Sequence, residues 1–211
     1  MSQSKSSTEF FKPVKTPSPF KYVECSTGES PPANAVQGGD DNGPSFHARG
    51  RVSGKNIPGK VGVDSPRNGR LKGACIPYGS KEHRVHTFEV LTSTLKASYV
   101  RCKTGDKPPK NAIEGGYDGG PSYHARGVVA GKRIPGKVGV DKEYDGNLKG
   151  ACIAYGGKEH RIHDFEVLVL NDEIIRVEYK VDEAKILSTT PKVIAKQKKN
   201  NPSSIDQRME F

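Results

Sequence analysis

The feature that most constrains this chain is an internal duplication. Residues 22–91 align with residues 99–168 at a constant offset of 77 positions and without a gap, and about two-thirds of the paired positions are identical. A period of this kind marks a repeated structural unit that buries its apolar face against its own copy. Any chemistry carried by one copy is therefore expected at two equivalent places in the chain.

Composition favours strands over helices within each copy. The 211 residues include 24 Gly and 15 Pro, which make turns frequent and interrupt helices, and no stripe with a helical period occurs in the repeats. Short segments with strand patterning recur instead. In the first copy they cover residues 46–49, 57–64, 74–78 and 83–91, and the pattern of the last is broken near Thr87. A unit of about 70 residues with few apolar side chains is marginal alone, so we expect the copies to pack as a pseudo-twofold pair.

The chain divides into four segments by composition. We expect a disordered leader at residues 1–19, because this stretch is rich in Ser, Lys, Thr and Pro. A first repeat follows at residues 20–96 and a second at residues 97–187, which includes an alternating segment at 174–181 that reads as a closing strand. By analogy, the strand at Tyr99 is expected to complete the first unit. Residues 188–211 are polar and basic, and are expected to form a flexible tail.

The formal charge of +10 is concentrated outside the repeats. Residues 1–21 carry four Lys against one Glu, and residues 180–211 carry seven basic against four acidic side chains. This distribution favours loose attraction to anionic surfaces, and we expect no specific nucleic-acid partner. No apolar run approaches the roughly 20 residues of a membrane helix, so no transmembrane segment is expected. The first residues lack the apolar stretch of a signal peptide, which predicts a cytoplasmic protein, with unconventional secretion or vesicle association as the other routes.

The four cysteines follow the duplication, with Cys25 matching Cys102 and Cys75 matching Cys152. Bridges between the matched residues would respect the symmetry, but four cysteines allow three pairings and the sequence does not choose among them. Since no signal peptide is present, reduced and buried thiols are the preferred interpretation.

Histidines also recur in both copies. His83 and His86 match His160 and His163, but residues three apart on a strand point to opposite faces, and no third ligand stands at metal spacing. We therefore expect no metal site and no cofactor. His47 and His124 are expected to be packed or hydrogen-bonded.

No motif of an enzyme is found. The segment at residues 50–56 is one residue too short for a phosphate-binding loop and lacks the hydroxyl residue after its Lys, and no Gly-x-Ser-x-Gly sequence occurs. Carboxylates are numerous, but nothing singles out a pair for glycoside hydrolysis. We therefore expect a protein without catalytic activity.

Short motifs recur in the same order in both copies. They are an aromatic-Val opening, Pro-Pro-x-Asn-Ala, Gly-Gly-x-Asp, aromatic-x-x-Arg, Pro-Gly-Lys-Val, Tyr-Gly-x-Lys-Glu-His and Phe-Glu-Val-Leu. With them, residues 20–181 resemble the DM9 repeat family. The resemblance implies an all-β fold of two tandem, pseudo-symmetric, antiparallel β-roll-like repeats used for carbohydrate recognition, and some members are mannose-binding lectins that recognise microbes. The chain departs from the family at Tyr22 and Tyr99, where Trp is common, and at Asp40, which stands where the second copy has Tyr117.

The resemblance also implies which residues hold the sugar. They are the Asp of Gly-Gly-x-Asp and the Lys of Pro-Gly-Lys-Val, here Asp41 with Lys60 and Asp118 with Lys137. A carboxylate accepts hydrogen bonds from two neighbouring hydroxyls and an ammonium donates to their oxygens, so the pairing suits a hexose. Spacing alone favours another interpretation, in which each Asp caps its own turn and each Lys is a solvated strand residue. Glu82 and Glu159 are secondary candidates.

These observations predict a non-enzymatic, lectin-like protein with up to two mannose-type sites per chain. A homodimer would present four sites, and linked binding events would raise avidity enough to agglutinate coated cells. The alternative is a cytosolic structural or stress-response scaffold that associates with vesicles or anionic surfaces through its basic tails.

Overall fold

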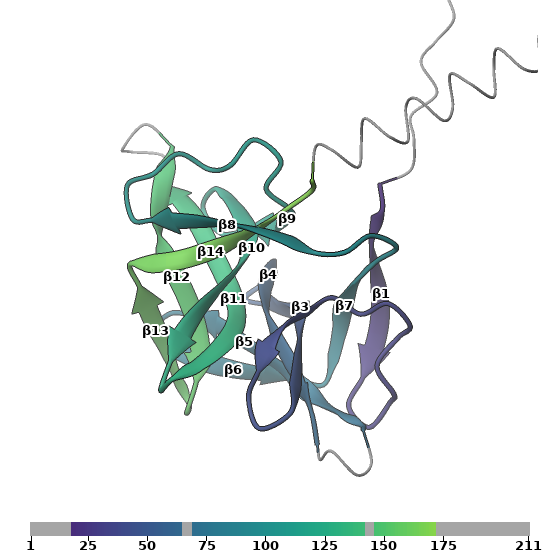
Figure 1. Ribbon diagram of the computed structural model, residues 1–211. Helices are drawn as coiled ribbons and strands as arrows, with labels where there is room; N and C mark the ends of the chain where they lie inside the picture. The colour runs from purple at the N-terminus through teal and green to yellow at the C-terminus, as the bar shows by residue number, and fades with distance from the viewer. Residues whose placement is uncertain (1–17, 65–68, 142–145, 172–211) are drawn as a thin grey trace, which may run out of the picture. The chain divides into compact units, whose positions relative to one another are not determined.

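The computed structural model describes residues 18–64, 69–141 and 146–171, which form fourteen β-strands and no helix (Figure 1). The first repeat contributes β1 (Phe20–Ser26), β2 (Gln37–Asp40), β3 (Pro44–Val52), β4 (Lys55–Val63), β5 (Leu71–Tyr78), β6 (Lys81–Val85) and β7 (Thr87–Ser93). The second contributes β8 (Ser98–Lys103), β9 (Glu114–Tyr117), β10 (Pro121–Val129), β11 (Lys132–Asp141), β12 (Asn147–Tyr155), β13 (Lys158–Ile162) and β14 (Asp164–Val169). The predicted all-β fold of two antiparallel repeats is confirmed. The tail at 188–211, the strand expected at 174–181 and nearly all of the leader lie outside the described residues.

The strand order shows the pseudo-twofold relation between the repeats. The strands follow the path β1-β7-β3-β4-β5-β6-β13-β12-β11-β10-β14-β8, with β2 added beside β3 and β9 beside β10. Read from either end, this path visits equivalent strands of the two copies. The halves meet where β6 pairs with β13, at Lys81 opposite Lys158.

The opening strand of each repeat pairs within its own repeat. β1 lies antiparallel to β7, and β8 lies antiparallel to β14 with Tyr99 opposite Leu168. The expectation that the Tyr99 strand completes the first unit is therefore wrong. The physical reason is that β1 already occupies the edge of β7 along its whole length, from Phe20 opposite Ser93 to Ser26 opposite Thr87.

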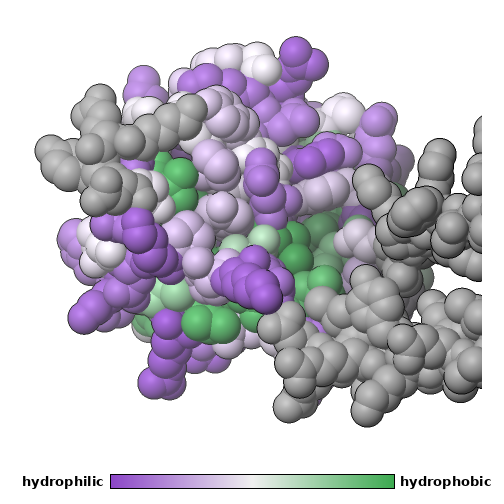
Figure 2. Space-filling model, turned by 90° about the horizontal axis from the view of Figure 1, so that it is seen from above, coloured by the Kyte–Doolittle hydropathy of each residue, from purple (hydrophilic) through white to green (hydrophobic). Residues whose placement is uncertain are grey.

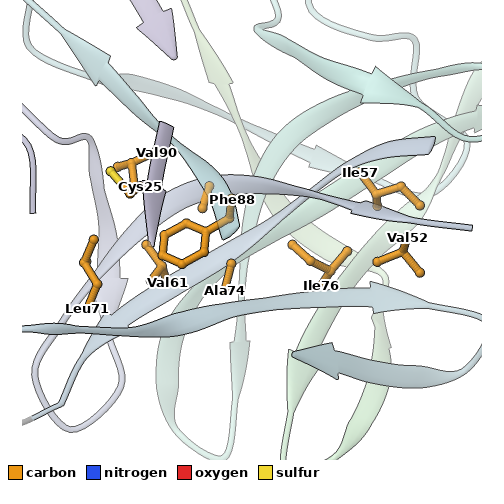
Figure 3. Packing of buried hydrophobic residues seen from close by; sticks show 10 residues of the cluster. Cys25, Val52, Ile57, Val61, Leu71, Ala74, Ile76, Phe88 and Val90 are labelled. Carbon is orange, nitrogen blue, oxygen red and sulfur yellow. The ribbon is translucent and has the colours of Figure 1, made fainter. Parts of the chain in front are cut away.

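Each repeat has its own hydrophobic core. In the first, apolar side chains of β1, β3, β4, β5 and β7 pack together, including Ile57, Leu71, Ile76 and Phe88 (Figure 3). The same positions of the second copy, among them Ile134, Leu148, Ile153 and Phe165, form an equivalent cluster. Burial of such side chains is the main contribution that holds each unit together.

Contacts between the repeats combine a small apolar cluster with a buried polar one. The apolar cluster contains Val36 and Leu91 from one copy and Leu168 from the other. Beside it, the His47 and His124 rings lie edge to face with their centroids 5.1 Å apart, and neither side chain is exposed. Each bonds a tyrosine of the opposite copy, as expected of packed histidines. Tyr22 and Tyr99 supply these hydroxyls.

On the face seen in Figure 2, hydrophilic side chains are numerous and hydrophobic patches lie between them. All four cysteines are free, and three of them are buried. Within the described ranges, the chain has no helix that is long and apolar enough to cross a membrane.

Candidate functional site: two carboxylate–lysine pockets shared between the repeats

The first predicted pair, Asp41 and Lys60, lies together in the structure. Asp41 follows β2, and its carboxylate accepts a hydrogen bond from Lys60 Nζ of β4 at 2.5 Å. Lys132 of β11, in the second repeat, also donates to this carboxylate, at 3.3 Å, and to the side-chain oxygen of Asn42 at 2.9 Å. The site is therefore built from both copies.

The second predicted pair repeats the arrangement. Lys137 Nζ donates to Asp118 at 2.8 Å, and Lys55 of the first repeat donates to the other oxygen of the same carboxylate at 3.2 Å. Sequence reasoning missed Lys55 and Lys132. Their identity at matching positions was visible, but no sequence pattern shows that β4 and β11 each bring a lysine to the opposite repeat.

Two observations disfavour the interpretation of these residues as a turn cap and a solvated lysine. Lys60 and Lys137 are only 5 % exposed, although each carries a charge. The carboxylate that caps the turn after β2 is that of Asp40, which accepts a hydrogen bond from Gly43 N at 3.0 Å. Asp41 is thus left to interact with lysines and with whatever enters the pocket.

The charge state of the two carboxylates follows from their neighbours. Burial by itself would raise the pKa of Asp41, but hydrogen bonds and positive charge from Lys60 and Lys132 outweigh it and hold the pKa below its usual value. Lys137 and Lys55 act in the same way and lower the pKa of Asp118. Both carboxylates are therefore ionised at neutral pH and act as hydrogen-bond acceptors.

A tyrosine ring from the opposite repeat stands beside each cluster. Lys60 Nζ lies 5.3 Å from the centre of the Tyr155 ring, and Lys132 Nζ lies 5.6 Å from it. Tyr78 stands in the same relation to Lys55 and Lys137, at 5.4 Å from each. Cation–π contacts of this kind fix the ammonium groups and present an aromatic wall.

Around Asp41 the surface is hollowed to a volume of about 550 Å³, within the range of small-molecule sites. The hollow is lined by Asp41, Asn42, Lys60, Gly62, Lys72, Gly73, Cys75, Glu82, Arg84, Tyr155, Gly156 and Gly157. Burial raises the pKa of the Cys75 thiol to about 12, so this sulfur stays protonated and is a poor nucleophile. The groups present are suited to hydrogen bonding with a polar ligand.

Comparison with known protein families gives a match. Residues 65–144 match the family model described as DM9 repeat. This stretch of the chain is similar to the DM9 repeat family. The matched segment begins within the first copy and ends within the second, so the repeat as the family model defines it starts at a different position from the duplicated unit described above. The match confirms the resemblance seen in the motifs.

The chain is also similar to a solved structure. The crystal structure of the nematode sperm cell motility protein MFP2B aligns with a TM-score of 0.52 and 21 % sequence identity, over 76 % of this chain and 49 % of that one. This likeness supports the fold, and the chain matches about half the length of that protein. No protein with a curated description matches the chain significantly.

The two glutamates named as secondary candidates connect the two repeats to each other. Glu82 accepts a hydrogen bond from Gly157 N at 2.7 Å, and Glu159 accepts one from Ser80 N at 2.7 Å. Glu82 also lines the hollow, but one of its carboxylate oxygens already accepts the hydrogen bond from Gly157 of the second repeat. Its main contribution is to position Tyr155 and Gly157 against the first pocket.

The histidine pairs considered as metal ligands bond elsewhere. His83 Nε2 lies 2.9 Å from the carbonyl oxygen of Tyr78, and His86 Nδ1 lies 3.1 Å from Thr27 Oγ1. Among the described residues, no group of three His, Cys, Asp or Glu side chains is placed to hold a metal ion.

Proposed function

We propose that each carboxylate–lysine pocket binds a mannose-type hexose, which makes this chain a carbohydrate-binding protein with two sites. The observation that carries the proposal is the ionised Asp41, held by two lysines from different repeats, at the floor of a hollow with a tyrosine in its wall. The lysine contacts leave lone pairs on the carboxylate oxygens, and each ammonium has donors to spare, so adjacent sugar hydroxyls can be both donors and acceptors here.

The proposal implies weak single sites and stronger multivalent binding. A sugar exchanges bonds to water for bonds to protein, so the net gain per hydrogen bond is only about 0.5–1.5 kcal/mol, and more where a charged group takes part. Two sites on one rigid unit would link binding events on a glycan-coated surface. A homodimer and a cytoplasmic location stay predictions, and the scaffold alternative rests on tails outside the described residues.

Calorimetric titration with mannose, using galactose as the comparison, tests the proposal. We expect two sites per chain in the parent and a loss of about 10- to 100-fold in affinity for Asp41→Asn/Asp118→Asn, which corresponds to a charged hydrogen bond of about 1.5–3 kcal/mol.

The matched control is Asp40→Asn, which removes one negative charge from the neighbouring position but keeps an oxygen to cap the turn. It should bind mannose like the parent. No heat with mannose, or equal binding by the folded Asp41→Asn/Asp118→Asn variant, would overturn the proposed site.

A further inference from the structure

The first pocket contains more positive than negative groups. Three cationic side chains line it, Lys60, Lys72 and Arg84, against the carboxylates of Asp41 and Glu82. Lys132 adds a fourth cation through its bond to Asp41. This excess of positive charge is not required to bind the neutral hydroxyl groups of a sugar.

Both carboxylates of the pocket already have partners. Asp41 is bonded to Lys60 and Lys132, and Glu82 accepts a hydrogen bond from Gly157 N. The half-buried Lys72 has no carboxylate within 4.0 Å in the described part of the chain. Arg84 has no ion pair among the residues described, and its guanidinium donates a hydrogen bond to the sulfur of Cys75 at 3.9 Å.

The second repeat treats the equivalent residues differently. Lys149, the counterpart of Lys72, is more exposed and forms an ion pair with Asp141 at 3.8 Å. Lys149 and Arg161 line a separate, smaller hollow of about 270 Å³ whose wall includes Asp141. The counterpart of Asp141 is the exposed Asp64, which forms no such pair with Lys72 in the described structure. The charge of Lys72, which is left over in the first pocket, is therefore paired at Lys149 in the second repeat.

We propose that the first pocket binds a hexose that carries an anionic substituent, with the anion against Lys72 and Arg84 and the ring hydroxyls against Asp41 and Lys60. This inference rests on the carbohydrate-binding function proposed above and narrows its ligand class to acidic sugars at one of the two sites. A carboxylate, sulfate or phosphate group would each accept charge-assisted hydrogen bonds from an ammonium and a guanidinium. The second site takes the neutral sugar.

The experiment compares mannose with mannuronate, which has the same hydroxyl stereochemistry and a carboxylate at C6, in calorimetric titrations of the full chain. Mannose 6-phosphate serves as a second arm that distinguishes a phosphate from a carboxylate. To isolate the first pocket, the titrations use the Asp118→Asn background. We expect at least one acidic sugar to bind about tenfold more tightly than mannose, and the preference to shrink as salt is raised.

Variants locate the anion. Lys72→Gln/Arg84→Gln should lose the preference for the acidic sugar while mannose binding persists, and the matched pair Lys149→Gln/Arg161→Gln should keep it. In the parent, nuclear magnetic resonance should show the Lys72 and Arg84 side-chain signals shifting with the acidic sugar and not with mannose, a readout that does not depend on a variant folding.

The outcomes separate this inference from the proposed function. Equal affinity for mannose and both acidic sugars would overturn the inference and leave carbohydrate binding standing. Unchanged preference in Lys72→Gln/Arg84→Gln would also overturn it. Absence of binding by every sugar would overturn the proposed function and this inference with it.

Discussion

His47 and His124 face each other at the contact between the repeats, with no exposure to solvent. The Nε2 atom of His124 lies 2.7 Å from the hydroxyl of Tyr22, and that of His47 lies 3.0 Å from the hydroxyl of Tyr99. Each Nδ1 is buried without a hydrogen-bond partner among the residues that the structure describes. Protonation would bury a charge beside a second histidine, so this pair fixes both rings in the neutral form.

The histidine pair predicts that stability falls on mild acidification. Burial lowers the pKa of His124 to about 3, and it lowers the pKa of His47 well below its usual value, with the nearby His124 adding to the effect. Below about pH 6.5 the unfolded chain binds a proton on each histidine and the folded chain does not, so stability is complete above that pH and is lost as pH drops. His124 should lower the free energy of unfolding by up to about 1.4 kcal/mol per pH unit between about pH 6 and pH 4, and His47 adds to this loss in the same direction.

Urea unfolding at a series of pH values measures this slope. Carboxylates also contribute in acid, so the comparison is with His47→Gln/His124→Gln, in which the slope should drop by both contributions. Independently, proton resonances of the parent should show that His47 and His124 do not titrate between pH 8 and pH 5. Titration of these two histidines near pH 6.5 would contradict the burial of the pair.

At the scale of the element, the short strands β2 and β9 hold the repeats in contact. The sequence suggests that Gly38-Gly39 forms a turn that leaves Asp41 uncovered, but both glycines belong to β2 and the turn comes after them. A Cβ atom at Gly39 would overlap the carbonyl oxygen of Arg133 in β11, and one at Gly116 would overlap that of Asn56 in β4. The glycines are needed because another backbone passes where a side chain would be.

A substitution at Gly39 should therefore loosen the contact between the repeats. We expect Gly39→Ala to reduce the free energy of unfolding by about 2–3 kcal/mol, since the overlap is with backbone that cannot rotate away. Gly139→Ala is the matched control because a Cβ there meets nothing within 4 Å, and its effect should stay within about 0.5 kcal/mol. Chemical denaturation measures both, and equal midpoints for the two variants would show that β2 does not pack as described.

The sequence predicts where several strands lie but not how they pair. The strand patterning of residues 57–64 and the short segment at 74–78 correctly indicate β4 and β5, and the broken pattern near Thr87 marks the boundary between β6 and β7. These elements have local signals in their own residues. The half-buried patterning expected at residues 57–64 is not observed, because β4 is buried on both faces over most of its length. The pairing of β8 with β14 and the packing of β2 on β11 have no such signal, since a duplication shows which residues are equivalent and not which ones touch.

For the whole molecule, the pseudo-twofold arrangement decides what the candidate site contains. Asp41 with Lys60, and Asp118 with Lys137, could be named from the sequence because the family resemblance implies them. Lys132 and Tyr155, which complete the first pocket, come from the other repeat and needed the strand order of the whole sheet. Each repeat thus finishes the site of its copy, and a single repeat would carry an incomplete pocket.

This sharing predicts that a substitution in one repeat changes the site of the other. In the Asp118→Asn background, where only the first pocket remains intact, Lys132→Ala should weaken mannose binding several-fold, and the pKa of Asp41 should rise toward its usual value because one of the two lysines that lower it is gone. Titration of the Asp41 carboxyl resonance reports the pKa change even without a sugar.

Lys55→Ala in the same background is the matched control, because Lys55 donates to Asp118 and not to Asp41. It should leave both the pKa of Asp41 and the affinity of the first pocket unchanged. The reverse pattern, with Lys55→Ala affecting Asp41 and Lys132→Ala silent, would mean that each repeat builds its pocket alone. The pseudo-twofold packing would then serve stability and have no part in the composition of the sites.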